Sequence, residues 1–496
     1  MILTNNHLYT QEATPEETEL VSQSLMVSVP GAYFTKAYKN KFWDGKKKFY
    51  DKRTKKCGSG FLEMLFDLAE EKDFLLRVED GRKEIRVPKV MSAKRWRAHL
   101  KSVGFEVNNY QSAMQVKAAR HGLHSYIKGA IHWPRGIFEI TTGGGKTSLA
   151  GLILQTLKKK KALFMVARLG LLYQTKDVLE RILQEPVGII GDTERRYERV
   201  TLVMAQTAGK LIKEGDAEFE SFVKSVKIAI LDEAHHLQDN SNYQDVLDLC
   251  SQAYFRFALT ATPQLRNDPG DAQLVGSFGQ TIFKIKSKKL RDRGVLAHVK
   301  TWVITNKTKF IAPKNKNALK ASGIYKNLDR NRIIVEAAQK FKDANWPCLV
   351  LVDTPLQHGQ AVQDAFSLLT GHKPPLINYK TPMQERRRLL TALEDGRISC
   401  IIASGGVFGE GIDAPLIRGL IRAEGGHSSI KTLQAAGRGM RRKPYPNVLY
   451  LVDIWDVSNK ILELDSRKRI QIYRDEEYEL HEVDGAEQIH ISEIEA

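Results

Sequence analysis

The sequence is poor in cysteine and has no long apolar run. Its four cysteines, Cys57, Cys250, Cys348 and Cys400, lie far apart without a Cys-x-x-Cys pair, so the pattern predicts packed, reduced thiols rather than disulfides or a zinc site. No apolar stretch reaches the ~20 residues that a membrane span needs. The N-terminal segment lacks the basic start, apolar stretch and cleavage site of a secretion signal. We therefore expect a cytoplasmic protein with no membrane partner, in the host cytoplasm if the chain is viral.

Short-period repeats and low-complexity tracts are also absent, which argues against a solenoid or a disordered tail. What is present is an ordinary globular composition, with 42% hydrophobic and 27% charged residues. The 496 residues exceed the size of a single core and predict about three domains. The formal net charge of +18 favours a polyanionic partner, although a basic charge alone is weak evidence for one.

A strand-then-helix rhythm runs twice along the chain and predicts an α/β fold with parallel sheets. The expected strands are Ala162–Val166, Val200–Met204, Ile228–Leu231, Phe257–Leu259, Cys348–Val352, Cys400–Ala403, Gly419–Arg422 and Val448–Val452. The expected helices include Asn331–Ala344 and Pro382–Asp395. We predict an N-terminal α+β accessory domain (1–105), a first lobe (106–300), a linker (301–330) and a second lobe (331–496).

The segment Ile137–Leu154, IFEITTGGGKTSLAGLIL, has the form of a phosphate-binding loop between a strand and a helix. Glycines let backbone N–H groups turn toward phosphate oxygens, and the following helix N-terminus favours negative charge. Lys146 would contact the β and γ phosphates of ATP and Thr147 would bind Mg²⁺. Ile140 replaces the first glycine of the longer loop pattern, and an ordinary glycine-rich turn is the alternative. The expected nucleotide-binding residues of this loop are Thr142, Gly143, Gly144, Gly145, Lys146 and Thr147.

Two adjacent carboxylates, Asp232 and Glu233, follow the apolar run of KIAILDEAHHL. The carboxyl edge of a parallel sheet is where ligands bind, so this pair is expected to face the phosphate loop. Asp232 would hold Mg²⁺ and Glu233 would polarise the attacking water. The alternative is a helix N-cap with a favourable dipole.

The sequences TTGGGKT and DEAH resemble motifs I and II of superfamily 2 helicases. Other segments of the first lobe match that family in order: Val166–Gln174 resembles motif Ia, Met204–Thr207 a nearby motif around a glutamine, and Leu259–Pro263 motif III. The resemblance implies two tandem RecA-like lobes. It also implies contacts to nucleic acid through Arg168, Gln206, Thr260 and Thr262, and a coupling role for His235.

The second lobe continues the resemblance. Leu349–Gly359 resembles motif IV, and Gly405–Pro415 resembles motif V, where Gly411 and Asp413 would contact the nucleotide. Gln434–Arg441, QAAGRGMR, resembles motif VI and implies catalytic roles for Gln434, Arg438 and Arg441 at the ATP bound by the first lobe. A guanidinium can stabilise the charge that develops on the γ-phosphate. A basic surface helix is the alternative for these arginines.

The adenine-binding segment of this family commonly contains a Tyr-Gln pair. We matched it to Leu123–Ala130, where Tyr126 fits and Ile127 replaces the glutamine. The resemblance at this position implies adenine stacking by Tyr126, and it leaves discrimination of the base by an amide in doubt.

The segment from Lys36 to Lys56 holds ten Lys or Arg residues and two Asp, interleaved with aromatic residues. Cations can neutralise phosphates while rings stack on exposed bases, so Trp43, Lys46, Lys47 and Lys48 are candidate nucleic-acid contacts. A two-stranded ribbon with one solvated face is an equally good interpretation. KNKFWDGKKKFYD also resembles the N-terminal domain of phage recombination helicases of the UvsW type.

Together these matches imply an ATP- and Mg²⁺-dependent DNA helicase or translocase, acting as a monomer on single-stranded and branched DNA. An RNA-directed remodelling ATPase and a catalytically silent nucleic-acid-binding scaffold are the alternatives. The motor motifs contact mostly sugar and phosphate, so they do not separate DNA from RNA.

Overall fold

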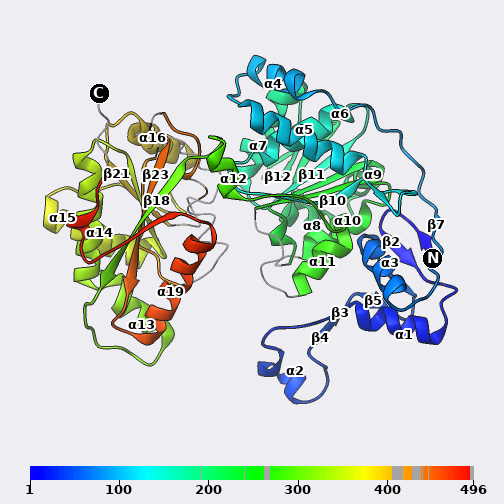
Figure 1. The fold of residues 1–496 in the computed structure, drawn as a ribbon, viewed down its shortest axis with the longest axis horizontal. Coiled ribbons are helices and arrows are strands. Elements are labelled where there is room, and N and C mark those ends of the chain that lie inside the picture. Colours follow the sequence, from blue (N-terminus) through cyan, green and yellow to red (C-terminus); the bar gives the residue numbers. More distant parts are fainter. Residues whose placement is uncertain are drawn as a thin grey trace. The chain divides into compact units, whose positions relative to one another are not determined.

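The computed structural model describes residues 1–191, 193–238, 241–261, 269–404, 417–426, 437, 439–444 and 446–491. The chain divides into two compact units, residues 1–141 with 145–285, and residues 286–496 with 142–144. Each unit contains one large sheet, and the first unit also contains smaller ones (Figure 1). In the described ranges no helix is both long and apolar enough to cross a membrane. All four cysteines are free and buried, as the sequence predicts.

The N-terminal region forms a five-stranded sheet of order β5-β6-β2-β1-β7 and a separate two-stranded ribbon of β3 and β4. Helix α1 (Pro15–Ser24) starts at Thr14, whose hydroxyl accepts from the Glu17 N–H while the Glu17 carboxylate accepts from the Thr14 N–H. This capping box satisfies two backbone donors at the helix start. The strands are β1 Ile2–Leu3, β2 His7–Tyr9, β3 Met26–Ser28, β4 Lys46–Lys48, β5 Tyr50–Asp51, β6 Lys56–Gly58 and β7 Glu79–Asp80. The remaining helices are α2 Lys36–Lys39, α3 Leu62–Glu71 and α4 Ala93–Ser102, and α5 Asn109–Leu123 follows at the start of the first lobe.

This region is docked tightly on the first lobe. The buried Arg135 guanidinium donates to the Asn5 carbonyl (3.1 Å) and to the Ser59 hydroxyl (2.6 Å). Arg256, also buried, donates to the Asn6 side chain. A Cβ at Gly60 would overlap the backbone of helix α11 (Pro269–Phe278), so the two backbones approach as closely as glycine permits. The N-terminal region and the first lobe therefore form one compact unit.

The first lobe has an eight-stranded sheet of order β13-β12-β14-β11-β15-β16-β10-β17, in which only β13 is antiparallel to its neighbour. Helices α5, α6 and α7 cover one face, and α8, α10 and α11 cover the other (Figure 1). The strands are β10 Arg135–Ile140, β11 Ala162–Val166, β12 Gly188–Gly191, β13 Glu194–Arg196, β14 Val200–Met204, β15 Ile228–Asp232, β16 Phe255–Thr260 and β17 Thr281–Ile285. The helices are α6 Lys146–Thr156, α7 Leu169–Leu183, α8 Ala205–Lys213, α9 Ala217–Ser225 and α10 Ser241–Leu249.

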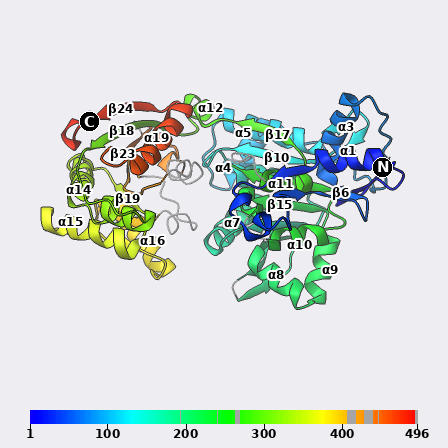
Figure 2. The same ribbon diagram turned by 90° about the horizontal axis from the view of Figure 1, so that it is seen from below.

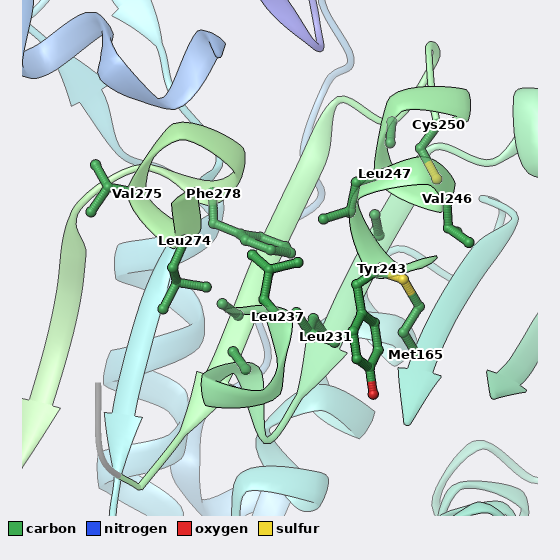
Figure 3. Close-up of a cluster of buried hydrophobic side chains, with 14 of the residues drawn as sticks. Met165, Leu231, Leu237, Tyr243, Val246, Leu247, Cys250, Leu274, Val275 and Phe278 are labelled. Carbon is green, nitrogen blue, oxygen red and sulfur yellow. The ribbon is translucent and has the colours of Figure 1, made fainter. Parts of the chain in front are cut away.

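The central strands of this sheet are buried along their whole length. Every residue of β11, β15 and β16 is buried, as expected for parallel strands covered on both faces. Figure 3 shows side chains of β11 and β15 packed against α10 and α11, with Tyr243 and Phe278 filling the space beneath the helices. This rigid core fixes the strand ends from which the candidate site projects.

The second lobe has a seven-stranded sheet, parallel throughout, of order β20-β21-β19-β22-β23-β18-β24. Helix α14 (Leu328–Asp343) lies beside α15 (Gln360–Thr370), as Figure 2 also shows. The strands are β18 His298–Asn306, β19 Cys348–Val352, β20 Leu376–Ile377, β21 Cys400–Ser404, β22 Gly419–Arg422, β23 Val448–Asp456 and β24 Glu479–Val483. The other helices are α12 Ser287–Asp292, α13 Lys316–Lys320, α16 Met383–Glu394 and α19 Lys460–Asp475.

The eight strands expected from the sequence are all present, but the predicted boundary between the lobes needs correction. The sequence predicts a linker at residues 301–330, whereas β18 occupies 298–306 and pairs in register with both β23 and β24. The buried Trp302, Val303 and Ile304 explain this placement, because a strand in the interior of the sheet removes their surface from water. The second lobe therefore begins before residue 301.

Candidate nucleotide-binding site

The expected phosphate loop lies between strand β10 and helix α6. Gly143 and Gly145 both have positive φ, +78° and +94°, a conformation that side-chain-bearing residues rarely adopt. Gly145 is the N-cap of α6, so Lys146 and Thr147 form the first turn of the helix. The loop therefore has the backbone that directs N–H groups and the positive end of a helix toward an anion.

Two glutamines of helix α5 support this loop from one side. The Gln115 amide donates to the Gly145 carbonyl at 3.3 Å, and its own oxygen accepts from the Trp96 indole N–H at 2.7 Å. A Cβ at Gly145 would overlap the Gln115 amide nitrogen and lie 3.0 Å from that of Gln111. Glycine at position 145 is thus required by space as well as by its φ angle.

Lys146 and Glu233 form the centre of the site. The Lys146 Nζ lies 2.9 Å from the Glu233 Oε1, and the two side chains are 9% and 20% exposed. The ammonium is therefore directed at the carboxylate that follows β15, across the intervening strand β16. His235 extends this cluster, since its Nδ1 lies 3.5 Å from the Glu233 Oε2.

Asp232 lies at the end of β15 and is almost completely buried. Its Oδ1 accepts from the Glu233 N–H at 2.9 Å, and Glu233 itself has a φ of +47°, an unusual conformation for a residue with a side chain. Burial raises the pKa of Asp232 to about 6, an effect that the charge of Lys146 opposes. A buried carboxylate that is costly to ionise gains most from a bound cation, so Asp232 fits the role of a metal ligand.

The raised pKa of Asp232 predicts a pH dependence of Mg²⁺-nucleotide binding. The folded-state pKa lies above the ordinary value of 3.8, so this group favours the folded protein at low pH and loses that contribution as the pH rises through about 6. A cation needs the ionised form, and binding must therefore release the proton. We expect the affinity for Mg²⁺-ADP to fall by up to about tenfold per pH unit below pH 6.

This dependence can be measured as the Kd of a fluorescent ADP analogue with Mg²⁺ between pH 5 and 8. The same titration with EDTA separates the cation's contribution from the ionisation of ADP itself. Asp232→Asn is the matched variant, and the Mg²⁺-dependent acid limb should vanish in it. An acid limb of equal size in both proteins would contradict the assignment.

The other predicted residues of the first lobe also lie at the carboxyl edge of its sheet. Thr260 is the buried last residue of β16, the strand between β10 and β15. Arg168 is the N-cap of α7 just after β11, and Gln206 is exposed in the first turn of α8 just after β14. Five adjacent parallel strands thus deliver the loop, the carboxylates and the expected nucleic-acid contacts to one edge.

The basic residues expected to bind nucleic acid belong to a different place in the same unit. Lys46, Lys47 and Lys48 make up β4, and all three are exposed. Their strand pairs antiparallel with β3, which lies outside the basic segment, so a two-stranded ribbon is present, but β4 lacks the packed face that the ribbon interpretation predicts. Trp43 precedes this strand and is half-buried.

The Tyr-Gln pair of the sequence lies in a different element from Tyr126, the residue predicted to stack on adenine. Tyr126 lies in the hairpin of β8 (Tyr126–Ile127) and β9 (Ile131–His132), where its ring packs against His132 at 5.0 Å. A Tyr-Gln pair does exist upstream, at Tyr110 and Gln111 in α5, and it is this glutamine that lies against the phosphate loop. The dipeptide itself was the available signal, and we therefore favour Gln111 over Tyr126 as the residue that contacts the base.

Replacing Gln111 with alanine is expected to weaken the preference for ATP over GTP. Loss of one amide that hydrogen-bonds the base should lower the ratio of the two kcat/KM values by about tenfold. Steady-state hydrolysis of both nucleotides measures it, and Gln23→Ala, a glutamine exposed on α1, is the matched control. Equal decreases in kcat/KM with ATP and with GTP would mean that Gln111 only supports the phosphate loop.

Several predicted residues lie outside the described part of the chain, namely Thr262, Gly411, Asp413, Gln434 and Arg438. Their roles stay predictions. Arg441 is described: it is exposed and forms an isolated antiparallel bridge with Leu296 in the second lobe.

In sequence and in fold, this chain is similar to ATPases of the helicase kind. Residues 105–265 match the family described as "Type III restriction enzyme, res subunit". The DNA 3'-5' translocase XPB2 of Sulfurisphaera tokodaii is 26% identical over 351 residues, which cover 64% of this chain and 77% of that protein. The ATP-dependent DNA helicase uvsW of Enterobacteria phage T4 is 23% identical over 342 residues, 65% of each protein.

A solved structure of a single-residue variant of S. cerevisiae Dbp5, bound to RNA and ADP BeF3, matches with a TM-score of 0.55 and 14% identity. The match covers 78% of this chain and 92% of that one, and it shows a shared fold. These comparisons confirm the resemblance to superfamily 2 helicases, the two RecA-like lobes and the prediction of a helicase-type ATPase. Parts of both curated relatives lie outside the matched regions.

Proposed function

We propose that this chain is an ATP-driven DNA helicase or translocase that remodels branched DNA as a monomer. The observation that carries the proposal is the group of Lys146, Glu233 and Asp232, in which Lys146 and Asp232 are buried, behind a glycine loop with left-handed residues. An ammonium, a carboxylate next to it and a second carboxylate that favours a cation are the groups that phosphoryl transfer to water needs. The names of the archaeal and phage relatives, both of which act on DNA, support DNA over RNA.

Each residue then has a defined role. Lys146 binds the β and γ phosphates, where the loop's N–H groups add further donors. Glu233 accepts a hydrogen bond from the attacking water and orients it. Asp232 and Thr147 would hold Mg²⁺, which neutralises the charge that develops on the phosphates during transfer.

The second lobe completes the proposed cycle. Arg438 and Arg441 stabilise the charge on the γ-phosphate, and Gln434 orients water or backbone beside it. Gly411 and Asp413 contact the nucleotide. Arg168, Gln206, Thr260 and Thr262 bind the sugar-phosphate backbone of the DNA. Binding and hydrolysis of ATP would alternate the grip of the two lobes on one strand and so move the protein along it.

The test is ATP turnover by the full chain with equal nucleotide concentrations of single-stranded DNA, linear duplex, a synthetic four-way junction and RNA. We expect stimulation by DNA, with the junction more effective than linear duplex of the same length, and no turnover by Lys146→Ala. Stimulation by RNA alone would overturn the DNA assignment. Binding of DNA without any turnover would instead favour a silent scaffold.

A further inference from the structure

The N-terminal region carries an arm that lies outside its small hydrophobic core. We define the arm as residues 26–48, in which β3 and β4 form an antiparallel stem and the segment between them contains α2. Met26 pairs with Lys48 and Ser28 with Lys46 along this stem. Figure 1 shows the arm extending from the five-stranded sheet, with α2 near its far end.

The tip of the arm exposes an unusual amount of aromatic surface. Phe42 is 86% exposed, Phe34 72%, Tyr33 59% and Tyr38 42%. Tyr33 and Phe34 pack on each other, with ring centroids 4.2 Å apart. Exposing a cluster of aromatic side chains to water costs free energy, and such a cluster on a soluble protein marks a binding surface.

Two of these rings, Tyr33 and Tyr38, line an open cavity of about 540 Å³. This volume falls within the range of pockets that bind molecules the size of a nucleotide. The lining combines aromatic faces with ammonium groups and comprises Tyr33, Tyr38, Lys39, Lys41, Trp43 and Asp44.

The charge of the arm is strongly positive. Residues 36 to 48 contain six lysines and one acidic residue, Asp44. That carboxylate is engaged within the arm: it accepts from the Lys46 N–H at 3.0 Å and lies 3.4 Å from the Lys48 ammonium. Its pKa is lowered, chiefly by the hydrogen bond from the Lys46 backbone, so the carboxylate stays ionised and stabilises the turn. The remaining positive charge favours a polyanion.

Internal contacts hold the tip in shape. The Trp43 indole N–H donates to the Lys46 carbonyl at 2.8 Å. Gly45 has a φ of +75°, and a Cβ there would lie 2.9 Å from the Tyr38 ring, so the loop closes tightly over that ring. At the stem, Lys47 donates to Gln273 of α11 at 2.7 Å, which ties the arm to the first lobe. A preformed surface binds with less entropic cost than one that must order.

We propose that the arm binds an unpaired segment of DNA, with a base stacked on the exposed rings of Tyr33 and Phe42 and phosphates held by Lys39, Lys41 and Lys46. Aromatic faces beside lysines are the combination that recognises single strands, because only unpaired bases present their faces for stacking. The inference deepens the proposed function: it assigns the recognition of unpaired DNA at a junction to the arm. The binding itself needs no ATP.

The test is equilibrium binding of the full-length protein without nucleotide to a fluorescent single-stranded oligonucleotide and to a blunt duplex. Phe42→Ala should weaken single-strand binding about tenfold and change duplex binding less than about twofold. Phe42→Trp should restore the single-strand affinity, because an indole stacks at least as well. Leu75→Ala is the matched control, since Leu75 is an exposed apolar residue (78%) outside the arm, and it should change neither affinity.

Lysine variants separate stacking from charge. Lys41→Ala should weaken the binding of both DNAs and reduce the slope of log K against the logarithm of the salt concentration by about one. Unchanged single-strand affinity in Phe42→Ala, or equal losses of affinity for single strand and duplex, would overturn the proposal. The exposed rings would then be assigned to binding a protein partner. Because the assay contains no nucleotide, a chain that binds through the arm but does not hydrolyse ATP would contradict the proposed function alone.

Discussion

Replacing Lys146 with alanine is expected to lower the kcat for ATP by at least about 10²–10³-fold. Its side chain is 9% exposed and its ammonium lies 2.9 Å from Glu233, at the end of a loop whose glycines direct N–H groups toward the same space. No water molecule can substitute for a buried cation that meets the charge developing on the γ-phosphate. The measurement is steady-state phosphate release at saturating DNA.

The matched control for this variant is Lys158→Ala, because Lys158 is an exposed lysine just after the same helix. It should leave turnover unchanged. Thermal melts of both variants check that the fold is retained. Turnover by Lys146→Ala within about threefold of the unmodified protein would place the nucleotide elsewhere.

Replacing Glu233 with glutamine is expected to separate binding from hydrolysis. An amide cannot accept the proton of the attacking water, and this loss should reduce the hydrolysis rate by about 10²–10⁴-fold. The affinity for ATP should be kept or increase, because a neutral amide competes less than a carboxylate for the Lys146 ammonium. Single-turnover hydrolysis together with the Kd for a fluorescent ATP analogue measures both effects.

Glu220→Gln is the control for the carboxylate, since Glu220 forms an ion pair of 2.8 Å with Lys224 on the surface of α9. Surface pairs of this kind contribute at most about 1 kcal/mol, so neither binding nor hydrolysis should change. If Glu233→Gln instead abolished ATP binding while hydrolysis per bound ATP stayed normal, Glu233 would support the loop rather than orient water.

Features encoded by neighbouring residues were predictable from the sequence. Ala162–Val166 and Cys348–Val352 were assigned as strands with the bounds that the structure shows, because buried parallel strands are continuous apolar runs. The same logic located Asp232 and Glu233, since the end of such a run lies at the ligand-binding edge of the sheet. The spacing of the motifs also predicted that the phosphate loop at Lys146 lies at this edge of the sheet.

Features that depend on distant pairing were not predictable. β18 carries Lys300, Thr301 and Thr305 among its apolar residues, so the run resembles a linker until β23 and β24 pair with it. Gln115 looks like an ordinary polar residue of α5, and only the packing of that helix on the loop gives it a role. The exposure of Phe42 likewise depends on the fold of the arm, because the sequence favours burial of such a ring.

DNA binding is expected to accelerate ATP hydrolysis at the site of Lys146 and Glu233. The test is the kcat for ATP of the full chain alone and with saturating single-stranded DNA, with Glu233→Gln measured beside it. We predict at least about a tenfold increase on addition of DNA, a difference of about 1.4 kcal/mol in the activation free energy, and no increase in the variant. Equal turnover with and without DNA, or stimulation that survives in Glu233→Gln, would contradict the account.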